Sequence, residues 1–146
     1  MAGRGTDDYA AELLTISSLQ RTLALRPDET GYHRLVWQPS RGSGYRALIM
    51  DGQPNASRAS TLDVAVINDS LIDTARQQLL SQLRDRLQTP EGQLDQLATL
   101  MLNDLTGQRL DSILDQLQAV PGDDIGPRIA HYLAPETQIL ITLNAQ

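Results

Sequence analysis

The sequence NDSLIDTARQQLLSQLRDRLQTPE, residues 68–91, decides the fold because it contains one complete helix pattern and the start of another. Asn68, Asp69 and Ser70 are residue types whose side-chain oxygens cap the first N–H groups of a helix. Apolar residues then recur every three or four positions, which predicts a helix to about Gln88. Its predicted buried stripe is Ile72, Ala75, Leu79, Leu83 and Leu87, with Leu80 alongside.

A second helix is predicted to start at Thr89-Pro90-Glu91. Thr is a good cap, Pro needs no N–H at the first helical position, and an acidic side chain favours the positive end of the helix. Its predicted buried stripe is Leu94, Leu97, Ala98, Met101 and Leu105, ended by Gly107. A third stripe follows at Leu110, Ile113, Leu114 and Leu117. After the turn at 121–124, residues 127–133 fit a last short helix.

The first half of the chain contains the strand-like segments. Residues 33–38 and 45–50 are separated by six residues rich in Gly and Ser, which predicts a β-hairpin. The expected cross-strand pairs are Trp37 with Arg46 and Leu35 with Leu48. Residues 62–67 carry apolar side chains on both faces, which indicates a central position in the sheet.

The two ends of the chain complete the expected topology. Residues 9–19 fit a short amphipathic helix, and residues 21–25 either continue it or begin a strand. Residues 138–143, Gln-Ile-Leu-Ile-Thr-Leu, have the composition of a strand. A lone terminal strand has to pair with the earlier sheet, because two-stranded fragments are marginal in water.

These segments predict a single α+β domain in which three to four helices cover one face of a mostly antiparallel sheet that includes the C-terminal strand. Residues 1–8 are expected to form a mobile tail and residues 9–146 the domain. Within the domain, residues 21–67 are strand-rich, residues 70–134 are helix-rich, and residues 138–143 form the terminal strand.

The composition excludes several classes of function. The 146 residues are 40% hydrophobic but only 3% aromatic, without Phe, so the core has to be aliphatic. The absence of Cys excludes disulfides, thiolate metal sites and cysteine nucleophiles. The net charge of −6 makes nucleic acid an unfavourable partner, because such binding needs cations against phosphates. All twelve basic residues are Arg, a coding bias that favours a bacterial or phage source.

The sequence also bears on location. Residues 1–20 lack the basic and apolar blocks of a secretory signal peptide. No apolar run approaches the roughly 18 residues of a membrane-spanning helix. We therefore expect a cytoplasmic protein without a membrane partner.

Motifs that carry catalysis or bind metal are missing from the sequence. His33 and His131 are the two histidines, and neither belongs to a metal-ligand pattern. No serine occupies the turn between strand and helix that activates hydrolase nucleophiles. The glycine-containing sequence at 41–46 resembles a phosphate loop but is predicted to join two strands rather than to open a helix. The sequence thus predicts no cofactor and favours a protein that is not an enzyme.

The predicted hairpin is a candidate binding surface. Between residues 30 and 60 there are four Arg and one acidic residue, a local net charge of +3 in an acidic chain. Arg, Tyr and Trp are enriched at the energetic centres of protein interfaces, and aromatic rings also stack on single-stranded bases. A plain solvated hairpin whose Trp faces the core explains the pattern as well. The candidate residues are Tyr32, Arg34, Trp37, Arg41, Tyr45 and Arg46.

A second candidate surface lies in the helical half, where Leu100, Leu102 and Val120 fall outside the narrow stripes. Apolar residues on more than one face of a helix imply burial on two sides, either under neighbouring helices or against a partner. Leu100 and Leu102 are therefore added to the candidate partner-binding residues, and a homodimer is the commonest form of such contact.

Three functions remain open on sequence grounds. The favoured one is protein–protein interaction or assembly, as an adaptor, an assembly or secretion chaperone, an immunity protein or a phage structural component. The second is a small enzyme with a dispersed acid/base site drawn from His33, Asp51, Asp63 and His131. The third is binding of an anion or nucleic acid through the Arg/Tyr/Trp hairpin.

Overall fold

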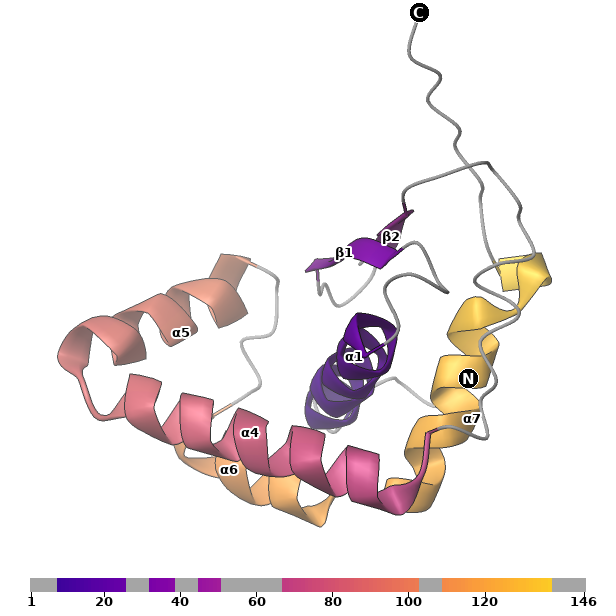
Figure 1. The fold of residues 1–146 in the computed structure, drawn as a ribbon. Coiled ribbons are helices and arrows are strands. Elements are labelled where there is room, and N and C mark those ends of the chain that lie inside the picture. Colours follow the sequence, from indigo (N-terminus) through magenta and orange to yellow (C-terminus); the bar gives the residue numbers. More distant parts are fainter. Residues whose placement is uncertain (1–7, 26–31, 39–44, 51–66, 103–108, 138–146) are drawn as a thin grey trace, which may run out of the picture.

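The described part of the chain is helix-rich and broadly α+β, with five α-helices and one two-stranded antiparallel sheet (Figure 1). The computed structural model describes residues 8–25, 32–38, 45–50, 67–102 and 109–137. The elements are α1 (Asp8–Ala24), β1 (Tyr32–Gln38), β2 (Tyr45–Met50), α4 (Asp69–Leu87), α5 (Pro90–Leu102), α6 (Leu110–Ala119) and α7 (Ile125–Leu133). Short 3₁₀ turns at Gly122–Asp124 and Pro135–Thr137 flank α7.

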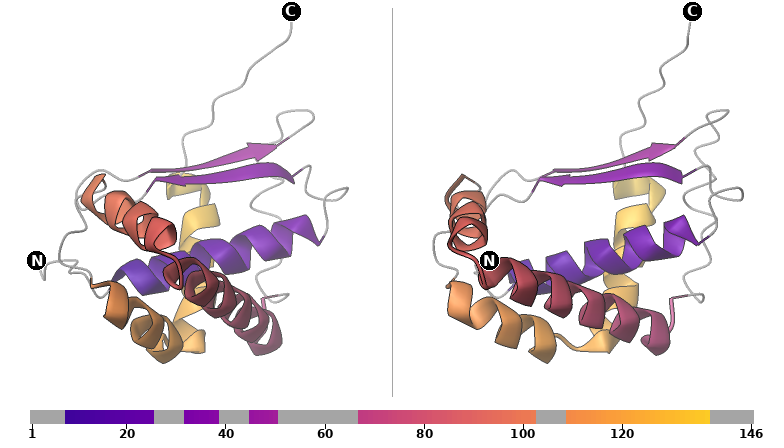
Figure 2. Two further views of the ribbon diagram at one scale, coloured as in Figure 1. Left: turned by 90° about the vertical axis from the view of Figure 1, so that its left-hand side faces the viewer. Right: turned by 60° about the vertical axis from the view of Figure 1, so that its left-hand side comes forward.

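Helix α1 lies at the centre of this arrangement. The hairpin covers it on one side, α4 and α6 lie on the opposite side, and α7 crosses one end (Figure 2). Its buried residues point around the whole helix: Tyr9, Ala10, Ala11, Leu14, Thr15, Ile16, Ser18, Leu19, Thr22 and Leu23. The prediction that residues 21–25 start a strand is wrong as to residues 21–24, which continue the helix. A helix buried on all sides does not need a narrow apolar stripe.

The buried hydroxyls of α1 explain how a helix with Thr in its interior positions is tolerated. The Oγ1 atom of Thr15 donates a hydrogen bond to the carbonyl of Ala11 at 2.6 Å. The Oγ1 atom of Thr22 donates to the carbonyl of Ser18 at 2.8 Å. These bonds within the helix avoid most of the cost of burying a polar group, which is incurred only when the group lacks a partner.

The hairpin forms with the predicted register. Trp37 pairs with Arg46 and Leu35 with Leu48, and an irregularity lies between Tyr32 and Arg34. Leu35, Trp37 and Leu48 pack against the helical core. The sheet therefore covers α1, and one of its faces packs against the helices.

Local capping sets the ends of α4 and the start of α5, as predicted. The Oδ1 atom of Asn68 accepts a hydrogen bond from the N–H of Leu71 at 3.0 Å, and α4 then runs to Leu87. The Oγ1 atom of Thr89 accepts from the N–H of Gly92 at 3.1 Å. The two helices meet so closely that a Cβ atom on Gly92 would lie 1.9 Å from the carbonyl oxygen of Arg86.

The core joins α1 to α4, α6 and α7. The predicted stripe of α6 is confirmed, with Ile113 and Leu117 fully buried and Leu110 and Leu114 packed against the core. In α4 the buried positions are Ile72, Ala75, Arg76, Leu80 and Leu83. Arg76 is the charged residue of this set, and its guanidinium reaches the end of α6.

The guanidinium of Arg76 caps the C-terminus of α6 from within the core. Its Nη1 atom donates to the carbonyls of Leu117 at 3.0 Å, Gln118 at 3.2 Å and Val120 at 2.7 Å. The last carbonyls of a helix have no partner within the helix, so a buried cation supplies the missing donors. Asp73, 3.8 Å from its Nε atom, adds a weak ion pair at the surface.

Some predicted segments fall outside the described residues. These are residues 1–7 of the tail predicted at 1–8, the turn at 27–31, the loop at 39–44, most of the strand at 62–67 and the terminal strand at 138–143. The last residue of the predicted tail, Asp8, begins α1. Ile67 is described and lies outside any strand. Within the described residues, no helix is long and apolar enough to cross a membrane.

Candidate functional site

The outer face of α5 carries an exposed row of large apolar side chains. Leu94, Leu97, Met101 and Leu102 are 67%, 40%, 68% and 85% exposed. Their spacing of three and four residues places Leu94, Leu97 and Met101 on one side of the helix. We call these four residues the outer face of α5.

This exposure overturns the predicted stripe of α5 at Leu94, Leu97 and Met101, and Ala98 is exposed as well, whereas Leu105 lies outside the described residues. The helix buries Gln96 and Leu100 instead, which lie on its opposite side. The close contact of Gly92 with the end of α4 turns the row Gly92, Gln96 and Leu100 towards the core. There Gln96 is buried and lies beside Tyr9. Of the two candidate residues from α5, Leu100 thus belongs to the core at 1% exposure, and Leu102 is at the surface.

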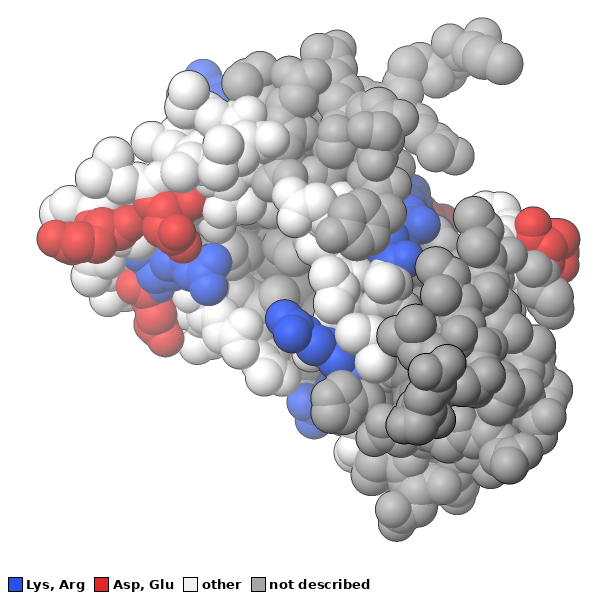
Figure 3. Space-filling model, turned by 90° about the horizontal axis from the view of Figure 1, so that it is seen from above, with Lys and Arg blue, Asp and Glu red and all other residues white. Residues whose placement is uncertain are grey.

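Two carboxylates flank the outer face of α5 on one side. Glu91 and Asp95 are one helical turn apart and exposed, and α5 contains no Lys or Arg. Between described residues, neither carboxylate forms an ion pair. Figure 3 shows acidic side chains at the end of the molecule where α4 meets α5, beside a broad uncharged surface and near Arg side chains. The outer face is therefore apolar with an acidic edge.

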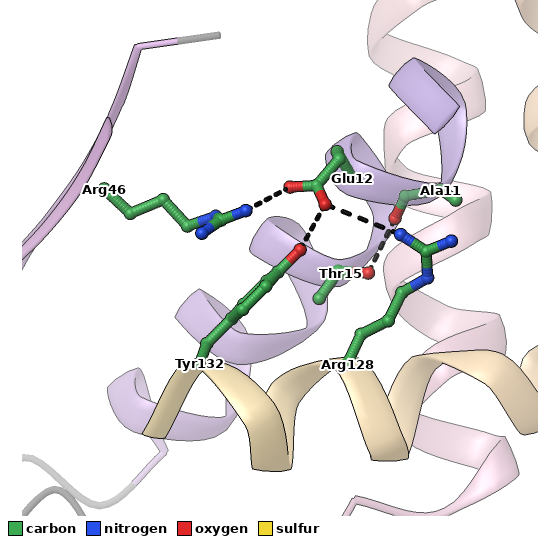
Figure 4. A network of polar contacts seen from close by, with 6 residues as sticks. All are labelled: Ala11, Glu12, Thr15, Arg46, Arg128 and Tyr132. Carbon is green, nitrogen blue, oxygen red and sulfur yellow. Dashed lines mark hydrogen bonds and ion pairs between the residues drawn. The ribbon is translucent and has the colours of Figure 1, made fainter. Parts of the chain in front are cut away.

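A polar cluster joins α1, β2 and α7 around the carboxylate of Glu12 (Figure 4). The Nη2 atom of Arg46 donates to its Oε2 atom at 3.0 Å. The Nη1 atom of Arg128 lies 3.5 Å from its Oε1 atom, to which the hydroxyl of Tyr132 also donates. The guanidinium of Arg46 stacks 3.7 Å above the ring of Tyr132. We call these four residues the Glu12 cluster.

The contacts of the Glu12 cluster indicate that it holds α1, β2 and α7 together rather than transferring a proton. Burial and the bond to Glu12 raise the pKa of Tyr132 far above its ordinary value, so the phenol keeps its proton. Glu12 accepts hydrogen bonds on both oxygens, from Arg46 on one and from Arg128 and Tyr132 on the other. A general base needs a free lone pair near its substrate, and those of Glu12 face donors of the same chain.

Two hairpin candidates point into the molecule. The ring of Trp37 stacks on that of Tyr9, with centroids 5.8 Å apart and planes at 25°. Burial raises the pKa of Tyr9, and the side chain of Gln96 partly offsets this by hydrogen bonding. Arg46 belongs to the Glu12 cluster. Arg34 is exposed on the other face of the sheet.

The remaining predicted candidates lie partly outside the described residues. Tyr32 and Tyr45 begin β1 and β2, while Arg41 lies outside the described residues. Of the dispersed acid/base set, Asp51 and Asp63 also lie outside, and His33 belongs to β1. His131 is exposed on α7, with its ring 6.3 Å from that of Tyr132. Among the residues that the structure describes, no group of three or more His, Asp or Glu side chains is placed to hold a metal ion.

Sequence reasoning missed the Glu12 cluster. Its partners Arg128 and Tyr132 are 116 and 120 residues away from Glu12, so no local motif connects them. Arg76 was detectable, because it falls in the row Ile72, Arg76, Leu80 of the buried stripe of α4.

Comparison of the chain with models of protein families, with curated proteins and with solved structures found no match. The function therefore has to be argued from the outer face of α5 and the Glu12 cluster themselves.

Proposed function

We propose that this protein binds another protein chain through the outer face of α5 and does not act as an enzyme. The observation that carries the proposal is the row of Leu94, Leu97, Met101 and Leu102, exposed to solvent along about two turns of one helix. Contiguous apolar surface of this kind marks protein interaction sites, whereas single exposed apolar side chains need no explanation.

The concentration of these residues supports the proposal. Six large apolar side chains are exposed among the described residues, and four of them belong to α5. The other two, Leu25 and Ile49, lie at the end of α1 and on the hairpin. Helices that dock on a partner present anchors at positions i, i+3 or i+4 and i+7, which is the spacing of Leu94, Leu97 and Met101.

The alternative functions have weaker support. Trp37 stacks on Tyr9 and Arg46 bonds to Glu12, so two of the six residues expected for nucleic acid or anion binding make contacts inside the chain. Docking on another protein is consistent with several roles. These are an adaptor, an assembly or secretion chaperone, an immunity protein and a phage structural component. We place this activity in the cytoplasm.

We also propose that residues 138–143 add a strand to the β1–β2 hairpin, as their composition suggests. A two-stranded sheet is marginal by itself, which favours a third strand. An Ile141→Pro variant is expected to lower the free energy of unfolding, because Pro cannot donate to a strand ladder. Equal stability of Ile141→Pro and the unchanged protein would overturn this part of the proposal.

Site-specific photocrosslinking in the native host tests the interaction surface. A photoreactive amino acid at position 102 is expected to give a covalent adduct, and one at the exposed position Gln118 on α6 is not. The double variant Leu94→Gln/Met101→Gln is expected to abolish the adduct. The matched variant Ile49→Gln, exposed on the hairpin, is expected to keep it. Equal adducts from positions 102 and 118, or none from either, would contradict the proposal.

A further inference from the structure

The acidic edge of α5 restricts which partner its outer face accepts. At about 100° per residue, Leu94, Ala98 and Met101 fall within one sector of the helix surface. Leu97 borders this sector on one side. Glu91, Asp95 and, nearer the C-terminus, Leu102 border it on the other. The other side of the row is bordered by the uncharged Gln93. The surface is therefore asymmetric, with an apolar centre and charge along one edge only.

We propose that the outer face of α5 binds an amphipathic helix whose apolar row is bordered on one side by Arg or Lys. This inference rests on the proposed function and adds the chemistry of the partner. The apolar row spans residues 94–102, about 12 Å at 1.5 Å per residue. Two helical turns of a partner match that length, and the ridge of one helix fits the groove between the rows of another.

The charge of the partner follows from the carboxylates of Glu91 and Asp95. Within the described ranges these carboxylates form no ion pair and α5 supplies no cation, although Arg side chains lie near this end of the molecule (Figure 3). A helix that docks on the apolar row approaches this edge and removes part of its water. Cations on the facing edge of the partner restore the lost interactions, whereas acidic groups there add repulsion.

A second copy of this chain is a poorer occupant. In an antiparallel pair of α5 helices around a two-fold axis through the row, like edges meet in opposite directions, so Asp95 faces the uncharged C-terminal part of that edge, around Leu102, in the other copy. In a parallel pair, unlike edges meet, and the carboxylates face the edge that contains Gln93. Neither arrangement brings a cation of α5 to Glu91 or Asp95.

Binding of designed peptides tests this inference on the purified full chain. The probes are two fluorescent helical peptides of about three turns with the same Leu row, one with Arg along one edge and its twin with Glu. Fluorescence anisotropy is expected to show at least about tenfold tighter binding of the Arg peptide at low salt, with the difference shrinking as salt is added.

Charge-neutral variants locate the effect. Glu91→Gln/Asp95→Asn is expected to weaken binding of the Arg peptide about three- to tenfold, the size of two exposed ion pairs. The control Asp115→Asn/Asp123→Asn removes two exposed carboxylates from α6 and the following 3₁₀ turn, and it is expected to bind as the unchanged protein does.

The outcomes separate this inference from the proposed function. If both peptides bind equally and this binding is lost in Leu94→Gln/Met101→Gln, the interaction surface is kept and the basic edge of the partner is overturned. If neither peptide binds while the photocrosslinked adduct persists, the helical partner is overturned and the proposed function is kept. A dimer in light scattering that becomes a monomer in Leu94→Gln/Met101→Gln overturns the inference in favour of self-association and keeps the proposed function.

Discussion

Glu12 connects three elements that are far apart in the chain, and its removal tests how much the hairpin depends on that connection. Glu12→Gln keeps the shape of the side chain but leaves Arg46 and Arg128 without their anion. Hydrogen bonds to charged groups in partly buried places contribute about 1.5–3 kcal/mol each, so we expect a loss of about 2 kcal/mol in the free energy of unfolding.

Urea denaturation followed by circular dichroism measures this loss. Glu136→Gln, which changes an exposed carboxylate after α7, is the control and is expected to stay within about 0.5 kcal/mol of the unchanged protein. Equal stabilities of Glu12→Gln and Glu136→Gln would show that the Glu12 cluster contributes nothing to the fold.

Arg76 is the second residue whose charge stabilises the interior of the protein. Arg76→Met keeps most of the side-chain volume but removes the donors to three carbonyls at the end of α6. Unpaired buried acceptors are costly, so a loss of about 2–4 kcal/mol is expected. Thermal unfolding monitors the change, with Arg84→Met on the exposed side of α4 as the control. A Tm of Arg76→Met as high as that of Arg84→Met would contradict this role.

At the scale of elements, the junction of α4 and α5 depends on Gly92. Adding a single methyl group at this position tests that dependence. Gly92→Ala places a Cβ atom 1.9 Å from the carbonyl oxygen of Arg86, so the helices have to separate. Overpacking of this kind costs about 1–3 kcal/mol. Gly126→Ala in α7 is the matched control, because nothing lies within 4 Å of the added atom.

The two glycine variants are expected to change stability in opposite directions. Ala favours the helix over Gly by up to about 1 kcal/mol where space allows, so Gly126→Ala is expected to stabilise. Chemical denaturation of both variants measures the difference. Stabilisation by Gly92→Ala would contradict the close approach and, with it, the orientation of α5.

Elements with a local rule were predictable from the sequence. The Asn68 cap, the Thr89-Pro90 start of α5 and the pairing of Trp37 with Arg46 all follow from short-range chemistry, and all are confirmed. The helix α1 was underestimated because Thr15 and Thr22 lower helix propensity, and their bonds to carbonyls of the helix cannot be read from propensity.

The orientation of α5 was mispredicted for a different reason. Its apolar residues occupy both sides, so periodicity alone does not say which side is buried. The choice depends on Gly92 against Arg86 and on Gln96 against Tyr9, and both contacts are between elements. The same limit hid the Glu12 cluster. Of the two candidate residues that the sequence indicated on α5, Leu102 is exposed, whereas Leu100 is buried within the chain.

At the scale of the whole molecule, two buried tyrosines make stability depend on alkaline pH. Burial raises the pKa of both Tyr9 and Tyr132 in the folded chain above the value of about 10 in the unfolded chain. Above pH 10 the unfolded chain therefore loses protons that the folded chain retains, and the free energy of unfolding falls as pH rises. Below pH 10 both states hold these protons, and the contribution is fully present.

Denaturation in urea at pH 9, 10 and 11 measures this dependence. Tyr9→Phe and Tyr132→Phe are each expected to flatten the decline above pH 10, because Phe has no proton to lose. A decline as steep in both variants as in the unchanged protein would assign the pH dependence to other groups.

The central place of α1 also affects how the protein is made. α1 leaves the ribosome before α4, α6 and α7, the helices that bury it, and about a hundred residues separate its end from the start of α7. At 5–20 residues per second, synthesis of that stretch takes on the order of 5–20 s. Until α4, α6 and α7 have all been made, Leu14, Leu19 and Leu23 lack part of their packing. The nascent chain thus exposes apolar surface of α1, to which chaperones bind, until translation reaches α7.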